Sequence, residues 1–152
     1  MLAISERLFL TLWVGGVWAI GFIAVPSLFH ILVDDKQMAG MLAGQMFKAI
    51  FVVSLVCCLA LFISQCSQAK QAVIKSWRAW LIMLSIVIVT VSFFYLQPSM
   101  AELKTIGLLE GSEQQQQFKL LHSISSSLYL VMALIGLSLV AFGIHAKNES
   151  SQ

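Results

Sequence analysis

Four polar side chains share one predicted helix face in the last apolar run of the chain, over residues 120–144: His122, Ser125, Ser126 and Tyr129. Their spacing of i, i+3, i+4 and i+7 places them on the same side of an α-helix. Hydrocarbon cannot hydrogen-bond such groups, so we expect this face to point into a helix bundle or an aqueous cleft. An imidazole in that position could ligate a metal, relay a proton or hydrogen-bond a solute.

His122 is predicted to lie near the outer leaflet of the membrane. His30, near the end of the first apolar run, is predicted to lie at a similar depth. Two imidazoles on different helices could ligate a haem iron or copper. Three methionines predicted near the same surface could serve as soft ligands for Cu(I): Met38, Met41 and Met100. The simpler interpretation is that His122 hydrogen-bonds to a neighbouring helix or to water. This interpretation predicts no cofactor, and a haem or copper site is the alternative.

The elements that must position these side chains are four long apolar segments, at residues 8–32, 41–64, 79–96 and 120–144. Each approaches or exceeds the ~20 residues that a helix needs to cross a hydrocarbon core of ~30 Å. The chain is 59% hydrophobic and only 11% charged, far more apolar than an ordinary soluble domain. We therefore predict an all-α membrane protein, a four-transmembrane-helix bundle. It forms a single domain over residues 1–146, followed by a short polar tail at 147–152.

Turn and cap signals predict where the helices begin and end. Asp34 followed by Gln37 resembles a capping box and predicts that helix 2 starts near residue 35. Ser112 with Gln115 marks the start of helix 4 in the same way.

A short interfacial helix is predicted between helices 3 and 4. Pro98 should end helix 3, and Ser99 with Glu102 has the form of a new capping box. Apolar residues then recur at helical spacing until Gly111: Met100, Leu103, Ile106 and Leu109.

Small residues on helices 1 and 2 predict a close contact between them. Helix 1 carries Gly15, Gly16, Ala19 and Gly21. Helix 2 opens with residues 39–44, which hold both a Gly-x-x-x-Gly pattern (Gly40 and Gly44) and an Ala-x-x-x-Ala pattern (Ala39 and Ala43). Such residues let helix backbones approach closely in a bilayer. We expect the contact to form within one chain, with a contact between two copies as the alternative.

Pro26 lies late in helix 1 and removes one backbone hydrogen bond, which frees the carbonyl of Phe22. The proline is interpreted as a kink that shapes the bundle. The alternative is that the freed carbonyl lines a polar cavity.

Basic residues favour one orientation of the spans. Four spans put both termini on the side that carries Lys70, Lys75 and Arg78 in one short loop, beside Trp77 and Trp80. Cytoplasmic loops are enriched in Lys and Arg, and Trp anchors helices at the interface, so we expect cytoplasmic termini. The formal charge of +2 is too mild to predict a nucleic-acid partner. The expected partners are the bilayer and either a second copy or another membrane protein.

Two further residue types inside the apolar runs have simple interpretations. We predict that Lys48 lies close to the outer interface, where its stem can carry the ammonium toward water. The alternative is a functional site, because a lysine deeper in the membrane would be costly. Cys57, Cys58 and Cys66 have no metal-binding spacing, and we expect them to pack as small apolar side chains.

Several short stretches together resemble DUF4149, a bacterial family similar to the eukaryotic transmembrane protein 205 group. The stretches are 12–16 and 25–29 in helix 1, 39–47 in helix 2 and 118–122 at the start of helix 4. The matching positions are Gly15, Gly16, Pro26, Phe29, Gly40, Gly44, Phe47 and His122. Tyr129 stands where the family pattern has Asn. The resemblance covers nearly the whole chain and implies a four-helix protein of the bacterial inner membrane.

We expect a protein that is not an enzyme and that binds or passes a small solute or supports a membrane complex. No Ser/His/Asp arrangement or carboxylate pair lies inside the predicted spans, so the sequence shows no machinery for hydrolysis. The alternative is a membrane redox protein that binds haem or copper through His122 and His30. In either class His122 should matter more than His30, because solvent can satisfy an imidazole at a helix end.

Overall fold

Every element that the structure describes is helical. The computed structural model describes residues 4–68, 76–106 and 112–145, and these ranges contain no β-strand. The elements in chain order are α1 (Ile4–Trp18), η1 (Ala19–Ala24), α2 (Val25–Ile31), α3 (Lys36–Gln68), α4 (Trp77–Val91), η3 (Ser92–Leu96), α5 (Gln97–Ile106) and α6 (Glu113–His145). The two elements labelled η are π-helical turns, each lying between two α-helices that it joins.

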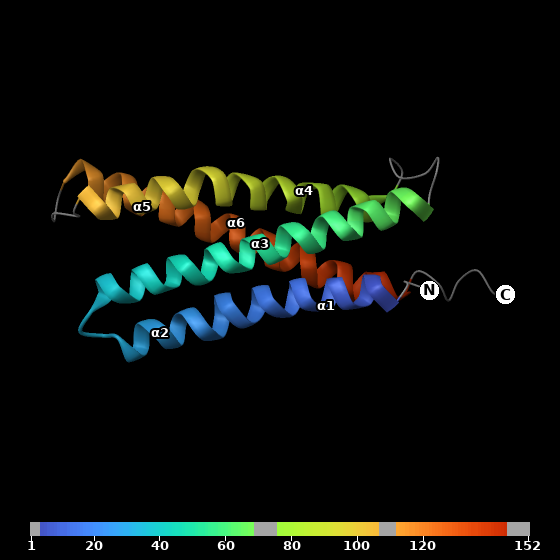
Figure 1. Ribbon diagram of the computed structural model, residues 1–152, viewed down its shortest axis with the longest axis horizontal. Helices are drawn as coiled ribbons and strands as arrows, with labels where there is room; N and C mark the ends of the chain where they lie inside the picture. The colour runs from blue at the N-terminus through green and yellow to red at the C-terminus, as the bar shows by residue number, and fades with distance from the viewer. Residues whose placement is uncertain (1–3, 69–75, 107–111, 146–152) are drawn as a thin grey trace.

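Four helices in the described ranges are long and apolar enough to cross a membrane: Ile4–Ile31, Lys36–Ser67, Trp77–Lys104 and Glu113–Phe142. This confirms the predicted four-transmembrane-helix architecture. In Figure 1 the four spans lie side by side, and the start of α1 and the end of α6 lie at the same end of the molecule. Around the bundle, α1 packs on α3, α3 on α4, α4 on α6 and α6 on α1.

A π-helical turn precedes each of the two prolines in the chain. The turn η1 ends just before Val25-Pro26, and η3 ends just before Gln97-Pro98. The N–H of Val25 donates to the carbonyl of Ile20, and the N–H of Gln97 donates to that of Ser92. Both bonds span five residues, one more than in an α-helix. Proline has no N–H to donate, and the wider turn lets the helix continue past it.

Pro98 does not end the third helix, contrary to the expectation from the sequence. The third span continues through η3 and α5 as far as Lys104. The hydroxyl of Ser99 does not cap a new helix but donates to the carbonyl of Tyr95 at 2.8 Å, one turn back in the same helix. The residues predicted as an interfacial helix therefore belong, as far as Ile106, to α5, which continues the third helix. The rest of that prediction lies outside the described residues.

Side-chain caps start two of the long helices. The carboxylate of Asp35 accepts a hydrogen bond from the N–H of Met38 at 2.8 Å, so the cap of α3 is one residue later than the predicted Asp34. The hydroxyl of Ser112 accepts from the N–H of Gln115 at 3.2 Å, as the sequence predicted for α6. Each cap satisfies an N–H that has no partner within its own helix.

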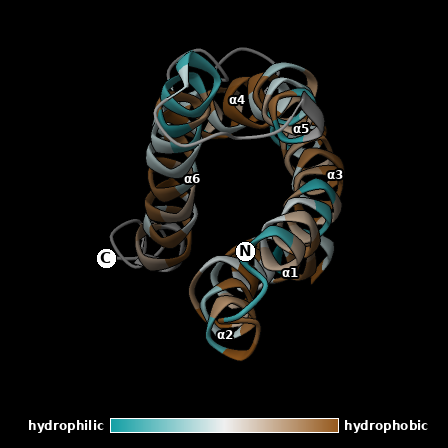
Figure 2. Ribbon diagram, turned by 90° about the vertical axis from the view of Figure 1, so that its left-hand side faces the viewer, coloured by the Kyte–Doolittle hydropathy of each residue, from teal (hydrophilic) through white to brown (hydrophobic). Residues whose placement is uncertain are grey.

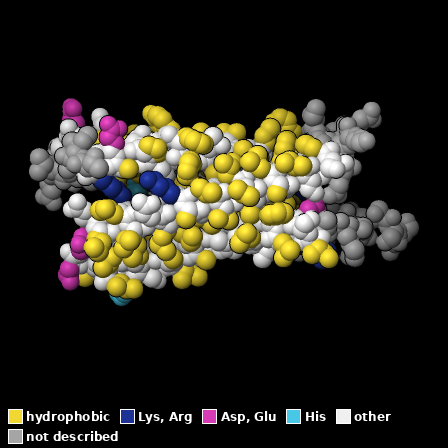
Figure 3. All heavy atoms as spheres, viewed as in Figure 1, with side chains coloured by type: hydrophobic (Ala, Val, Ile, Leu, Met, Phe, Trp, Pro, Cys, Tyr) yellow, Lys and Arg dark blue, Asp and Glu magenta, His cyan; other side chains and the backbone are white. Residues whose placement is uncertain are grey.

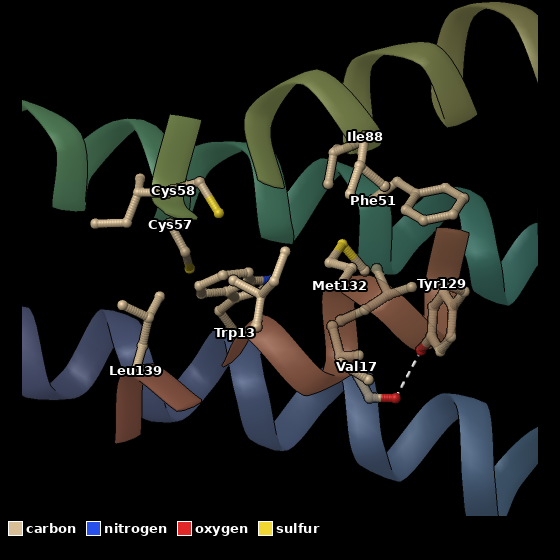
Figure 4. Packing of buried hydrophobic residues seen from close by; sticks show 14 of the residues in the cluster. Trp13, Val17, Phe51, Cys57, Cys58, Ile88, Tyr129, Met132 and Leu139 are labelled. Atoms are coloured by element: carbon tan, nitrogen blue, oxygen red, sulfur yellow. Dashed lines mark hydrogen bonds between the residues drawn. The ribbon is translucent and has the colours of Figure 1, made fainter. Parts of the chain in front are cut away.

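The core of the bundle is packed around Trp13 of α1, which is fully buried. Figure 4 shows its indole close to Val17 of the same helix and to Cys57 of α3, with Met132 and Leu139 of α6 nearby. Cys57 and Cys58 are free thiols in this core, whereas Cys66 is a free thiol on the exposed surface. The expected apolar packing therefore holds for the two cysteines inside the second span.

Polar contacts join the helices at the end where the described chain starts and finishes. Glu6 of α1 is only 2% exposed and accepts a hydrogen bond from the hydroxyl of Ser64 of α3. At the same end, the guanidinium of Arg78 donates to the carbonyl of Phe142 at 3.5 Å. These contacts link α1 with α3 and α4 with α6.

Candidate functional site

One half of the bundle is closed by direct contacts between α1 and α6. The hydroxyl of Tyr129 donates to the carbonyl of Val17 at 2.6 Å (Figure 4), and the indole of Trp18 donates to the carbonyl of Ala133 at 3.4 Å. We call this part of the molecule the closed half.

The other half is splayed. Beyond η1 the chain of the first span continues as α2, which packs on α3, while the start of α6 packs on α5. Figure 2 looks along the bundle from this end and shows α2 and α6 on opposite sides, with α3 and α5 between them. We call this part the open half. Because its outer helices separate, polar side chains on their inner faces need not be covered by another helix.

Lys104 of α5 reaches across the open half. Its ammonium donates to the carbonyl of Gly40 of α3 at 2.9 Å and lies 5.4 Å from the ring centroid of Phe118 of α6. Lys104 is partly buried. The cation therefore bridges three helices, held by a backbone carbonyl and by the face of an aromatic ring.

The face of α3 that meets Lys104 also carries a bare backbone and a second lysine. Gly40, Gly44 and Lys48 are four residues apart, so they follow one another along one side of the helix. The Lys104 ammonium lies 3.5 Å from the position that a Cβ would have at Gly40, so this face is turned toward α5. A Cβ at Gly44 would meet no atom within 4 Å. The backbone between the two lysines therefore faces open space.

We call this region the lysine cleft, and define it by Gly40, Gly44, Lys48, Lys104, Phe118 and His122. In Figure 3 a hollow is visible at this end, and dark-blue Lys or Arg side chains gather in it, while acidic side chains lie on the outer surface. The charged residues of this end agree with that view. Lys48 and Lys104 are partly buried, whereas four carboxylates are exposed: Asp34, Asp35, Glu102 and Glu113.

Helix α6 is the third helix of the cleft and contributes His122 beside Phe118. The imidazole of His122 stacks on Phe118 with ring centroids 5.9 Å apart and an interplanar angle of 12°. Phe118 in turn lies beneath the Lys104 ammonium. His122 is exposed.

The predicted polar stripe on helix 4 divides between the two halves. Ser125 and Tyr129 are buried, whereas His122 and Ser126 are exposed. Tyr129 belongs to the closed half, where its ring meets the ring of Phe47 edge to face at 5.1 Å. The stripe therefore starts in the cleft and ends in the contact that closes the bundle.

His30 lies exposed in the last turn of α2, on a different helix from His122. The described residues contain no group of three or more His, Cys, Asp or Glu side chains that could hold a metal ion. Of the three methionines considered for copper, Met38 and Met41 are exposed and Met100 is buried. A haem or copper site built on the two histidines stays a prediction.

Only some of the small residues predicted to bring the helices together do so. A Cβ at Gly15 or Gly44 would meet nothing within 4 Å, and Ala19 is exposed. Close approach does occur at Gly16, where a Cβ would lie 2.7 Å from Ile50 Cδ1 of α3, and at Gly21, which faces Tyr129 of α6. The α1–α3 contact itself is extensive, with Ala39 and Ala43 as the buried small residues of α3. Of the two patterns predicted in residues 39–44, the alanine pair is therefore buried, whereas the glycine pair faces Lys104 and open space.

Lys104 and Lys48 were not predicted as site residues. Lys104 was missed because Pro98 was expected to end the helix before it. Lys48 was expected to carry its ammonium to the interface, with a functional site as the alternative. A usable signal was present: it lies seven residues after Met41, about 10 Å inside an apolar run, where a charge is costly.

The fold and the cleft define a multi-pass helical membrane protein with a polar cleft in one half of its bundle. The chain belongs to the DUF4149 family, described as a domain of unknown function, which matches residues 8–108. The match includes Gly40, Gly44, Lys48 and Lys104 of the cleft. No curated protein and no solved structure matches the chain.

Proposed function

We propose that this protein binds a small amphipathic molecule in the lysine cleft and carries out no chemistry on it. The observation that carries the proposal is the open space at Gly44, which lies between two partly buried lysines inside apolar spans. A buried charge in a bilayer is expensive and is retained where it serves a function. A molecule that is polar at one end and apolar at the other fits a polar cleft within a membrane helix bundle.

The cleft residues favour binding over catalysis. Lysine and histidine offer charge and hydrogen bonds, whereas the described cleft holds no carboxylate that could orient His122 as a general base. The imidazole stacks on an aromatic ring, an arrangement that suits a wall of a binding site.

We place the protein in the bacterial inner membrane, with the start of α1 and the end of α6 on the cytoplasmic side. Support comes from the joint position of these two ends in Figure 1 and from the basic residue Arg78 beside them. In this orientation the lysine cleft opens toward the outer leaflet. The similarity to the eukaryotic transmembrane protein 205 group, and a homo-oligomer or membrane partner, stay predictions.

Filling the cleft tests the proposal. The purified wild type is incubated with single-chain amphiphiles that carry neutral, anionic or cationic head groups, and retained molecules are measured by native mass spectrometry. We expect Gly44→Trp to abolish retention, because the indole fills the space beside Lys104. Gly15→Trp is the matched control, since Gly15 also faces open space but lies outside the cleft. Equal retention by both variants, or none by the wild type, would refute the proposal.

A further inference from the structure

We propose that the ligand of the lysine cleft carries an oxyanion, a carboxylate or phosphate group, that contacts Lys48 and Lys104. This inference rests on the proposed function and adds the chemical class of the ligand. It starts from the imbalance of charge within the cleft, where the two partly buried charged residues are both lysines. Two ammonium groups repel one another in a medium of low dielectric, so an anion between them is favoured.

The spacing of the two lysines suits a single head group. Lys104 contacts the carbonyl of Gly40, and Lys48 lies eight residues further along α3, about 12 Å away along the helix axis. Each lysine stem spans roughly half of that separation, so both ammonium groups can reach the region above Gly44. The absence of a side chain at Gly44 leaves that region open.

Lys104 keeps hydrogen-bonding capacity for a ligand. An ammonium has three N–H donors, and the carbonyl of Gly40 uses one of them. Within the described part of the chain, its other close neighbour is the Phe118 ring, which takes no strong hydrogen bond. The remaining donors can contact carboxylate or phosphate oxygens, and charge-assisted hydrogen bonds of this kind are strong and short.

Helix α6, the third helix of the cleft, adds hydrogen-bond donors to it and no negative charge. His122 stacks on Phe118 next to Lys104, and its ring nitrogens can donate to an oxyanion. The acidic residues that the structure describes at this end, Asp34, Asp35, Glu102 and Glu113, are exposed, so water screens them from the cleft. A cationic ligand would meet two lysines in the cleft and is therefore disfavoured.

Matched amphiphiles with one chain length test the inference. Dodecyl phosphate, dodecanoate and dodecanol are titrated into the purified wild-type protein, and the Kd values are measured by calorimetry. We expect each anion to bind at least about tenfold more tightly than the alcohol, the effect of one charge-assisted hydrogen bond. Lys104→Met and Lys48→Met should each remove about tenfold of anion affinity while dodecanol binding stays the same.

Exposed lysines at the same end provide the controls. Lys36→Met and Lys119→Met remove the same charge outside the cleft and should leave all three Kd values unchanged. Lys104→Arg keeps the charge and should keep the preference for anions. If Lys104→Met fails to fold, as judged by its thermal unfolding, Lys48→Met carries the test alone.

The outcomes separate this inference from the proposed function. Equal binding of dodecanol and both anions, with loss of binding in Gly44→Trp, overturns the oxyanion and keeps the cleft as the binding site. Absence of binding by all three compounds overturns both. Displacement of dodecyl phosphate by phosphatidylglycerol points to a lipid head group as the source, and displacement by inorganic phosphate points to a soluble anion; either supports the inference.

Discussion

The ring of Tyr129 occupies the space that a side chain at Gly21 would need. A Cβ at position 21 would lie 2.9 Å from both Cζ and Oη of this tyrosine, with another ring carbon closer still. Gly21 lies within the π-helical turn η1, and the tyrosine hydroxyl donates to Val17, one turn earlier. The contact joins α6 to the first span at the point where the closed half ends and the open half begins.

Gly21→Ala should destabilise the protein by about 1–3 kcal/mol, the usual range for overpacking a filled site. The new methyl group must displace the aromatic ring, which is also in edge-to-face contact with Phe47. Unfolding of the detergent-solubilised protein by heat or denaturant measures the loss. Gly15→Ala is the control, because it adds a methyl group where nothing lies within 4 Å. If the two variants are equally stable, the close approach at Gly21 is absent.

Tyr129→Phe should cost about 1 kcal/mol, because it removes the 2.6 Å hydrogen bond to Val17 and keeps the ring. Tyr95→Phe removes a hydroxyl from an exposed side chain of η3 and should have no measurable effect. The free energy of unfolding of both variants is compared with the wild type. A Tyr129→Phe variant as stable as Tyr95→Phe would mean that the hydrogen bond contributes nothing.

Gly44→Leu should leave stability nearly unchanged, whereas Gly136→Leu should lower it clearly. A Cβ at Gly136 would lie 2.9 Å from Cγ2 of Val14, and a β-branched side chain has little freedom to move aside. A Cβ at Gly44 would meet no atom within 4 Å. Melting temperatures of the two variants, measured in one detergent, decide the matter. The reverse order would show that Gly44, and not Gly136, lies in a tight helix contact.

Ser54→Ala should leave the stability unchanged or raise it. The hydroxyls of Ser54 and Ser92 are buried and have no hydrogen-bond partner among the described residues. Removing a buried polar group of this kind relieves its desolvation penalty. Ser64→Ala is the contrasting variant, because its hydroxyl donates to the buried carboxylate of Glu6, and it should destabilise. A clear loss of stability in Ser54→Ala would reveal a partner for its hydroxyl.

The four spans were predictable because hydropathy over about 20 residues reports directly on membrane crossing. The continuation of the third helix past Pro98 was not predictable, since a π-helical turn is a change in hydrogen-bond register that no particular residue type indicates. Pro98 indicates a helix end by its chemistry alone, and only the backbone of Ser92–Leu96 shows how the end is avoided.

The candidate site was half predictable. The period of helix 4 placed His122 and Ser125 on one face, and the structure puts His122 beside the Lys104–Phe118 contact. The Gly-x-x-x-Gly pattern of helix 2 was taken to predict a close helix contact, whereas Gly44 faces open space. The pattern alone does not say whether another helix or a cleft covers that face. Only the position of α5 relative to α3 resolves this, and that position depends on the unpredicted course of the third helix.

Photolabelling tests the central claim, that the lysine cleft binds an amphiphile, most directly. A dodecyl probe with a diazirine on its chain is activated in the presence of the protein, and the labelled peptides are mapped by mass spectrometry. We predict labels near Gly44 and on the neighbouring parts of α5 and α6 that line the cleft, suppressed by excess unlabelled dodecyl compound and lost in Gly44→Trp. Labels spread evenly over the lipid-facing surfaces of the helices, unaffected by competitor or by Gly44→Trp, would contradict the claim.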